Sequence, residues 1–156
     1  MNEPANSSPP AWSASPSAKT KTAVQRSVTT LLDELAPERV LKRVEELRGP
    51  VEQHRTPTGC VLQATGAAVS VSWFAEGGSQ TALGELHVIV WRGTVARRGA
   101  TRHQKGATIV TELVLHPIEP TTDDFLWHAN DGTRYDTASL AAKCLALLQT
   151  QLETTN

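Results

Sequence analysis

Hydrophobic residues in the first third of the chain recur at the spacing of an α-helix. Four of them, spaced four, three and four apart, share one helical face: Val24, Val28, Leu31 and Leu35. A second helix is predicted at residues 37–47, because proline is tolerated in a first helical turn and Gly49-Pro50 provides a stop signal. The preceding residues, 1–21, are rich in Pro, Ser and Ala, a composition that predicts disorder.

The middle of the chain changes to an alternation with a period of two, which indicates β-strands. We predict four of them, at residues 60–74 with an interruption near Gly66, and at 82–91, 108–116 and 125–129. The polar residues 51–59 before them are expected to form a loop. An Asn130-Asp131-Gly132 turn closes the last hairpin, because these residue types tolerate a positive φ.

The alternation also assigns side chains to the two faces of the sheet. In the second strand one face carries Leu86, Val88 and Val90, and the other carries Glu85, His87, Ile89 and Trp91. In the third strand one face carries Ile109, Leu113 and Leu115, and the other carries Val110, Glu112, Val114 and His116.

A last helix completes the predicted fold. Asp136 is suited to be its N-cap, and its apolar stripe consists of Leu140, Cys144, Leu147, Leu148 and Leu152. The predicted order is α-α-β-β-β-β-α, an α+β fold in which two N-terminal helices and one C-terminal helix pack on one face of a four-stranded antiparallel meander. Residues 22–154 are expected to form one domain.

Composition adds little to this picture. The chain has 156 residues and a net charge of −1, so overall charge does not select a partner. Cys60 and Cys144 form no metal-like motif, and no apolar run has the length of a membrane span. We therefore expect a cytoplasmic protein of bacterial type, without membrane contact and without a cofactor. Trp12, alone in the tail, is a candidate anchor for a partner.

Two groups of residues carry candidate chemistry. The first is a basic segment after the second strand, formed by Arg92, Arg97, Arg98, Arg102 and Lys105. These cations could bind the phosphate backbone of nucleic acid, with Trp91 as a stacking surface for a single strand. The acidic residues between 112 and 136 offer the alternative that the segment pairs with the chain itself, or with a second copy.

The second group becomes a cluster if the second and third strands pair. Its members are Glu85, His87, Glu112 and His116. Such side chains can bind a metal ion or act as general acid and base, although the polar outer face of an ordinary sheet carries the same residue types.

No nucleophile elbow, phosphate-binding loop or dinucleotide motif occurs in the sequence. The sequence therefore favours a small non-enzymatic accessory or protein-interaction module, able to form a homodimer through its helices or an exposed sheet edge. Nucleic-acid binding through residues 92–105 is one alternative. A small metal-dependent or acid/base enzyme that uses His87 and His116 is the other.

Overall fold

The structure is a computed structural model, and it describes residues 18–36, 39, 51–75, 83–95, 106–118 and 125–155. Three of the predicted features lie outside these ranges: the tail up to residue 17 with Trp12, the helix at 37–47 apart from Arg39, and most of the basic segment.

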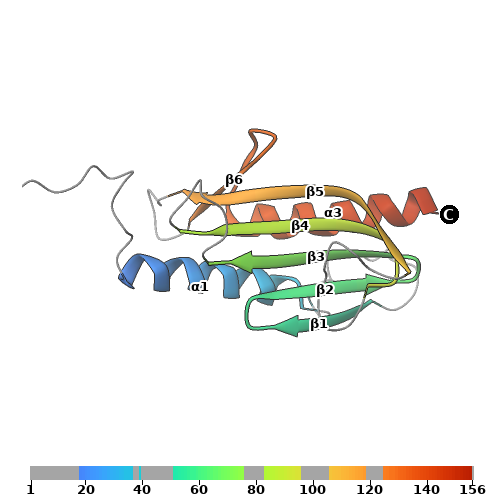
Figure 1. The fold of residues 1–156 in the computed structure, drawn as a ribbon, viewed down its shortest axis with the longest axis horizontal. Helices are drawn as coiled ribbons and strands as arrows, with labels where there is room; N and C mark the ends of the chain where they lie inside the picture. Colours follow the sequence, from blue (N-terminus) through green and yellow to red (C-terminus); the bar gives the residue numbers. More distant parts are fainter. Residues whose placement is uncertain are drawn as a thin grey trace, which may run out of the picture.

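The described residues form two helices and one seven-stranded antiparallel sheet (Figure 1). Each strand lies beside the next one in sequence, so the sheet is a continuous meander. The helices are α1 (Ala18–Glu34) and α3 (Thr137–Thr155). The strands are β1 (Glu52–Thr56), β2 (Gly59–Ala64), β3 (Ala67–Phe74), β4 (Glu85–Gly93), β5 (Ala107–Ile118), β6 (Leu126–Ala129) and β7 (Arg134–Tyr135).

The prediction of four strands and three helices is wrong, although the α+β class and the antiparallel meander are correct. The predicted strand at 60–74 is the hairpin of β2 and β3, which turns at Gly66 with a φ of 81°. The predicted loop at 51–59 contains β1, an edge strand too polar to show alternation. A two-residue β7 follows the Asn-Asp-Gly turn, and the predicted helix at 37–47 falls almost entirely outside the described residues.

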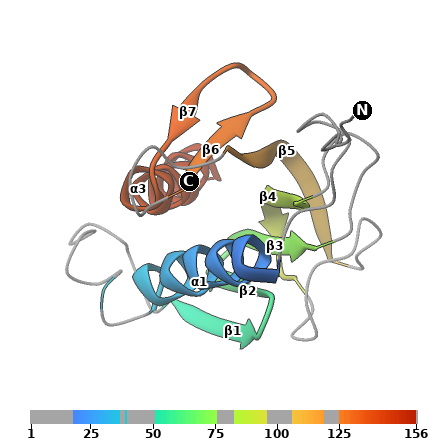
Figure 2. The ribbon, with the colours of Figure 1, turned by 90° about the vertical axis from the view of Figure 1, so that its left-hand side faces the viewer.

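Helices α1 and α3 lie side by side on the same face of the sheet (Figure 2). The predicted stripe of α1 is fully buried there, as are Leu140, Cys144 and Leu148 of α3. They pack on strand residues that include Leu62, Val69, Leu86 and Leu115. This helix–sheet layer is the main hydrophobic core, and in the described residues no helix is long and apolar enough to span a bilayer.

Local signals at the start of α3 behave as predicted. The Ser139 N–H donates to the Asp136 carboxylate at 2.7 Å, which satisfies one of the free N–H groups at the helix N-terminus. In the preceding turn the Thr133 N–H donates to Asp131, and Gly132 has a φ of 91°. These short-range contacts fix the direction in which α3 leaves the sheet.

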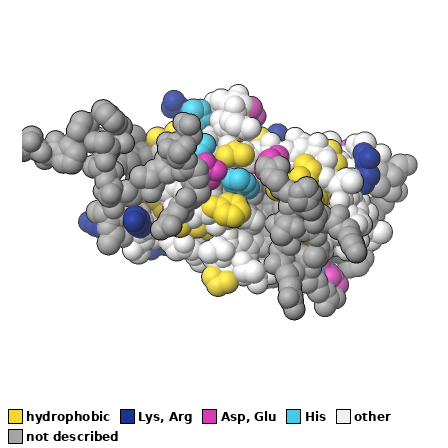
Figure 3. Space-filling view, viewed as in Figure 1, with side chains coloured by type: hydrophobic (Ala, Val, Ile, Leu, Met, Phe, Trp, Pro, Cys, Tyr) yellow, Lys and Arg dark blue, Asp and Glu magenta, His cyan; other side chains and the backbone are white. Residues whose placement is uncertain are grey.

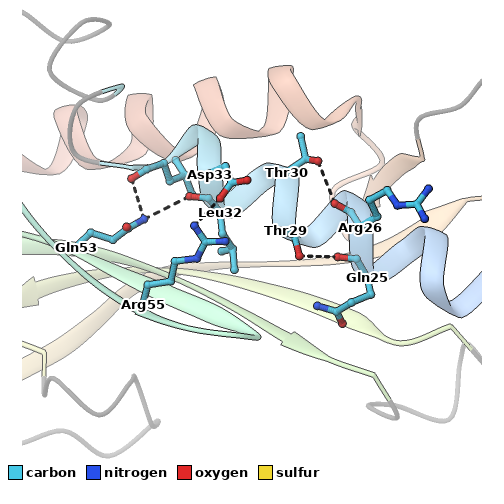
Figure 4. Close-up of polar contacts among 9 residues, drawn as sticks. Gln25, Arg26, Thr29, Thr30, Leu32, Asp33, Gln53 and Arg55 are labelled. Atoms are coloured by element: carbon cyan, nitrogen blue, oxygen red, sulfur yellow. Dashed lines mark hydrogen bonds and ion pairs between the residues drawn. The ribbon is translucent and has the colours of Figure 1, made fainter.

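The edge strand β1 is held against the end of α1 by two polar side chains (Figure 4). The Gln53 amide donates to the carbonyl of Leu35 at 3.0 Å and to that of Leu32 at 3.4 Å. Arg55 forms an ion pair with Asp33 at 2.6 Å. Gln53 thus ties β1 to the backbone at the C-terminal end of α1, where carbonyl groups lack the partners of a continuing helix.

A β-bulge corrects one predicted face. The register between β4 and β5 shifts from Val90–Thr111 to Trp91–Ile109, so Val110 has no partner residue on β4. Beyond this bulge Ile109 packs with Trp91 on the side away from the helices, whereas the prediction had placed it beside Leu113 and Leu115. An inserted residue of this kind reverses the alternation, and no sequence period reveals it.

Candidate functional site

The sheet face that α1 and α3 leave uncovered is the candidate functional surface, called here the open face (Figure 3). Near the end of β4 it carries a small buried cluster of Val61, Ala68, Ile89, Trp91, Val95 and Ala107, with Ile109 packed against it. Toward the start of β4 it carries histidine and acidic side chains next to hydrophobic ones, and these gather near the middle of the view in Figure 3. The two parts differ in exposure: the first part is buried, whereas the second part has partly exposed polar side chains among the described residues.

The four predicted residues Glu85, His87, Glu112 and His116 come together on this face, and we call them the Glu–His cluster. Nε2 of His87 lies 2.9 Å from Oε2 of Glu85, and its Nδ1 lies 3.6 Å from Oε2 of Glu112. Nε2 of His116 lies 3.5 Å from the other oxygen of Glu85. A single imidazole is therefore held between two carboxylates, and Glu85 is shared by two imidazoles.

Strand pairing explains this arrangement. Glu85 and His87 are two residues apart on β4 and so point to the same face. On β5, Val114 is the partner of His87, which places Glu112 and His116 diagonally on either side of that histidine. The bulge lies farther along β4, after Val90, so the predicted alternation still holds in this part of the sheet.

The cluster is half-buried, and its side chains lie against one another. Side-chain exposure is 14% for Glu85 and 32% for His116, with the other two members between these values. The hydrogen bond from His87, and to a lesser extent the nearby His116 imidazole, lower the pKa of the Glu85 carboxyl against the opposing effect of burial. Glu85 therefore remains a carboxylate throughout the neutral range.

An exposed aromatic ring borders the cluster. Phe74 ends β3 opposite Glu85, and 47% of its surface is accessible. Its ring packs on the imidazole of His87, with the ring centroids 4.8 Å apart. On the other side, His128 of β6 is the strand partner of His116 and is exposed. Phe74 was absent from the predicted site, although its place at the end of the alternating run that ends β3 is the signal that could have identified it.

The geometry does not form a metal site. Among the described residues, no three His, Cys, Asp or Glu side chains are grouped so that they could hold a metal ion. The cluster residues contact one another instead, and both ring nitrogens of His87 face carboxylates. What the cluster can do chemically is to offer a fixed carboxylate, a charge that depends on pH and an adjacent apolar ring.

The other predicted site residues are less accessible or fall outside the described ranges. Trp91 is fully buried, and its indole N–H donates to Ser70 at 2.9 Å, so its ring is not an exposed stacking surface. Arg92 is exposed at the end of β4. The rest of the basic set, Arg97, Arg98, Arg102 and Lys105, and the partner candidate Trp12 lie outside the described residues.

The sequence also provided no indication of the hydrogen bonds that hold the two ends of the basic segment, at residues 93–95 and at Gly106. The Gln63 amide donates to the carbonyl of Gly93 at 2.9 Å and accepts from the Val95 N–H at 2.9 Å. The Thr94 N–H donates to the carbonyl of Gly106 at 3.0 Å, which joins the two ends of the segment. A glutamine that bonds across more than thirty residues leaves no local signal in the sequence.

Comparisons with protein-family models, with curated proteins and with solved structures found no match to this chain.

Proposed function

We propose that the protein is a non-enzymatic interaction module, and that its open face binds a protein segment presenting an arginine beside an apolar side chain. The observation that carries the proposal is the contact between exposed Phe74 and the half-buried Glu–His cluster. Exposed aromatic rings next to a few polar groups are characteristic of interaction surfaces.

Charge supports a cationic partner. When both imidazoles are neutral, the two carboxylates of the Glu–His cluster give it a net negative charge, and the lowered pKa of Glu85 keeps that carboxyl ionised. A guanidinium group can pair with a carboxylate and lie over an aromatic ring at the same time. Glu85 and Phe74 are strand partners and so stand close enough to serve one arginine. Phosphate, by contrast, would be repelled by this part of the face.

The geometry favours binding over acid/base catalysis. A general base needs a ring nitrogen that is free to reach a substrate proton. His87 directs Nε2 at Glu85 and Nδ1 at Glu112 instead. The half-buried carboxylates therefore fix the orientation of the imidazole, and the imidazole in turn fixes Glu85 for an incoming cation.

The test is an NMR titration with two matched peptides. The first probe is acetyl-Gly-Leu-Arg-Val-Gly-amide, and the second carries citrulline, which is neutral, in place of arginine. We expect saturable shifts of the amide signals of Phe74, Glu85 and His87 with the arginine peptide, at a Kd of about 1 mM. The citrulline peptide should bind at least about tenfold more weakly, because it lacks the charge.

Variants assign the effect to the site. Glu85→Gln keeps the size of the side chain and removes its charge, and Phe74→Ser removes the ring; each should abolish most of the peptide response. Glu153→Gln removes an exposed carboxylate on α3 and should leave binding unchanged. Equal binding of both peptides, or arginine-dependent shifts that persist in Glu85→Gln, would contradict the proposal.

A further inference from the structure

Among the described residues, one edge of the sheet is both uncharged and exposed. Strand β5 has twelve residues, but among the described residues β6 pairs with it only from Leu115 to Ile118. Asn130 ends this ladder, because its backbone N–H donates to the Val114 carbonyl at 2.9 Å and its side-chain oxygen accepts from the Val114 N–H at 3.4 Å. Residues 108–111 extend past this point as an outer edge.

These four residues, called here the β5 edge, have the sequence Thr-Ile-Val-Thr. All are β-branched, which favours strand pairing, and none is charged. Thr108, Val110 and Thr111 are exposed, and 43% of the surface of Val110 is accessible. Val110 is also the extra residue of the bulge and has no partner residue on β4.

The remaining edges are protected in recognised ways. The outer edge of β1 carries Glu52, His54 and Arg55, and charges on an edge strand discourage further pairing. The opposite edge of the sheet is β7, which has only two residues. Natural sheets shield edges by charge, by shortness or by a bulge. The β5 edge has a bulge at Val110 but carries no charge, and its exposed β-branched side chains remain available for pairing.

We propose that the β5 edge pairs with the same edge of a second copy of this chain, in an antiparallel arrangement about a two-fold axis. Such a contact is self-complementary, because each strand meets its own sequence in reverse. With Val110 opposite the partner's Val110, Glu112 faces the partner's Thr108, so no like charges are opposed. A strand from a different protein would need a sequence complementary to the β5 edge. A second copy of this chain always supplies such a strand, at the concentration of the protein itself.

The test measures the mass of the full-length chain in solution. Sedimentation velocity from about 1 µM to about 1 mM, which spans weak to moderate Kd values, should show a concentration-dependent species of twice 16.8 kDa. Val110→Lys places like charges across the two-fold axis and should raise the dimer Kd at least about tenfold. Thr150→Lys adds the same charge at an exposed position of α3 and should leave the Kd unchanged.

Charge complementation identifies the contact. Val110→Lys and Val110→Glu should each be monomeric alone, yet a mixture of the two should form a heterodimer. This result requires that residue 110 of one copy faces residue 110 of the other. Circular dichroism and the Tm of each variant confirm that it is folded before its mass is interpreted.

A second measurement needs no substitution. Hydrogen exchange of the backbone amides in residues 108–111 should slow as the concentration of the unmodified protein rises through the dimer Kd, because pairing protects them. A monomer at every concentration would overturn the proposal. So would a dimer that survives Val110→Lys, or one in which exchange at the β5 edge does not depend on concentration.

Discussion

The side chain of Gln63 on β2 binds the backbone at the end of β4, where the β4–β5 connection begins. Its removal tests how much these hydrogen bonds stabilise the fold. Its Nε2 lies 2.7 Å from the Ala64 carbonyl, 3.1 Å from that of Ala67 and 2.9 Å from that of Gly93. Its Oε1 accepts from the Val95 N–H. Because an amide nitrogen has only two hydrogens, these four contacts amount to about three hydrogen bonds.

Gln63→Leu keeps the approximate volume of the side chain and removes all of these bonds. Each is worth about 1 kcal/mol net, and the side chain is half-buried, so we expect the free energy of unfolding to fall by about 2–3 kcal/mol. For a chain of this length the Tm should fall by about 5–10 °C. Urea unfolding followed by tryptophan fluorescence measures the first quantity, and calorimetry measures the second.

The control is Gln25→Leu, because Gln25 is a half-buried glutamine of α1 whose side chain makes no hydrogen bond within the described residues (Figure 4). It should change the free energy of unfolding by less than about 0.5 kcal/mol. Hydrogen exchange at the Val95 amide adds a local readout, since this N–H loses its acceptor in Gln63→Leu. Equal effects of the two substitutions, or unchanged protection at Val95, would refute the reasoning.

Three further predictions concern caps, glycine and thiols. Asp136→Ala should cost about 1 kcal/mol at pH 7 in urea unfolding. The hydrogen bond from the Ser139 N–H lowers the pKa of the Asp136 carboxyl below 3.8, so this contribution is present above pH 3.8 and is lost as the pH falls through the lower, folded-state pKa. Gly93→Ala should lower the free energy of unfolding by more than about 1 kcal/mol, and by more than Gly132→Ala does. Both glycines have a positive φ, but of the two only Gly93 would bring a Cβ into overlap with a carbonyl oxygen, that of Gly106. Burial raises the pKa of the Cys60 thiol to about 11 and also raises that of Cys144, so a thiol reagent at pH 8 should titrate both cysteines only after unfolding; rapid reaction of the native protein would contradict their burial.

The parts of the fold that the sequence predicts correctly are those in which burial repeats with a fixed period. The α1 stripe and the two faces of β4 follow from spacing alone, because each residue's environment is set by its own element. The Glu–His cluster was predictable for the same reason. Its four residues lie on the neighbouring strands β4 and β5, in the part of the ladder that comes before the bulge along β4. Alternation alone therefore placed them on one face, without any knowledge of the register.

The missed features depend on contacts between distant residues. β1 is held in place by its hydrogen bonds to β2 and by the contacts of Gln53 with α1 rather than by apolar burial. Neither kind of contact produces a hydrophobic period in the sequence. The bulge beside Val90 moves Ile109 to the other face through one inserted residue. The alternation of β3 indicates which face Phe74 occupies, but its position beside Glu85 is set by strand pairing. Such features are set by tertiary structure, which overrides local pattern.

A dimer formed through the β5 edge would also bring two Glu–His clusters together. Antiparallel pairing of two β5 edges about an axis perpendicular to the sheet joins the sheets edge to edge, so the same face of each copy points in the same direction. Both Glu–His clusters would then lie on one continuous surface and could engage two arginine-bearing segments of a single ligand.

A peptide with two Leu-Arg-Val units on a flexible linker long enough to span both clusters should therefore bind the dimer at least about tenfold more tightly than the single unit. Val110→Lys should abolish this gain and leave the affinity for the single unit unchanged, whereas Glu85→Gln should weaken both peptides. Isothermal titration calorimetry above the dimer Kd separates these results. If the gain persists in Val110→Lys, it arises within one copy, and the two surfaces are not joined through the β5 edge.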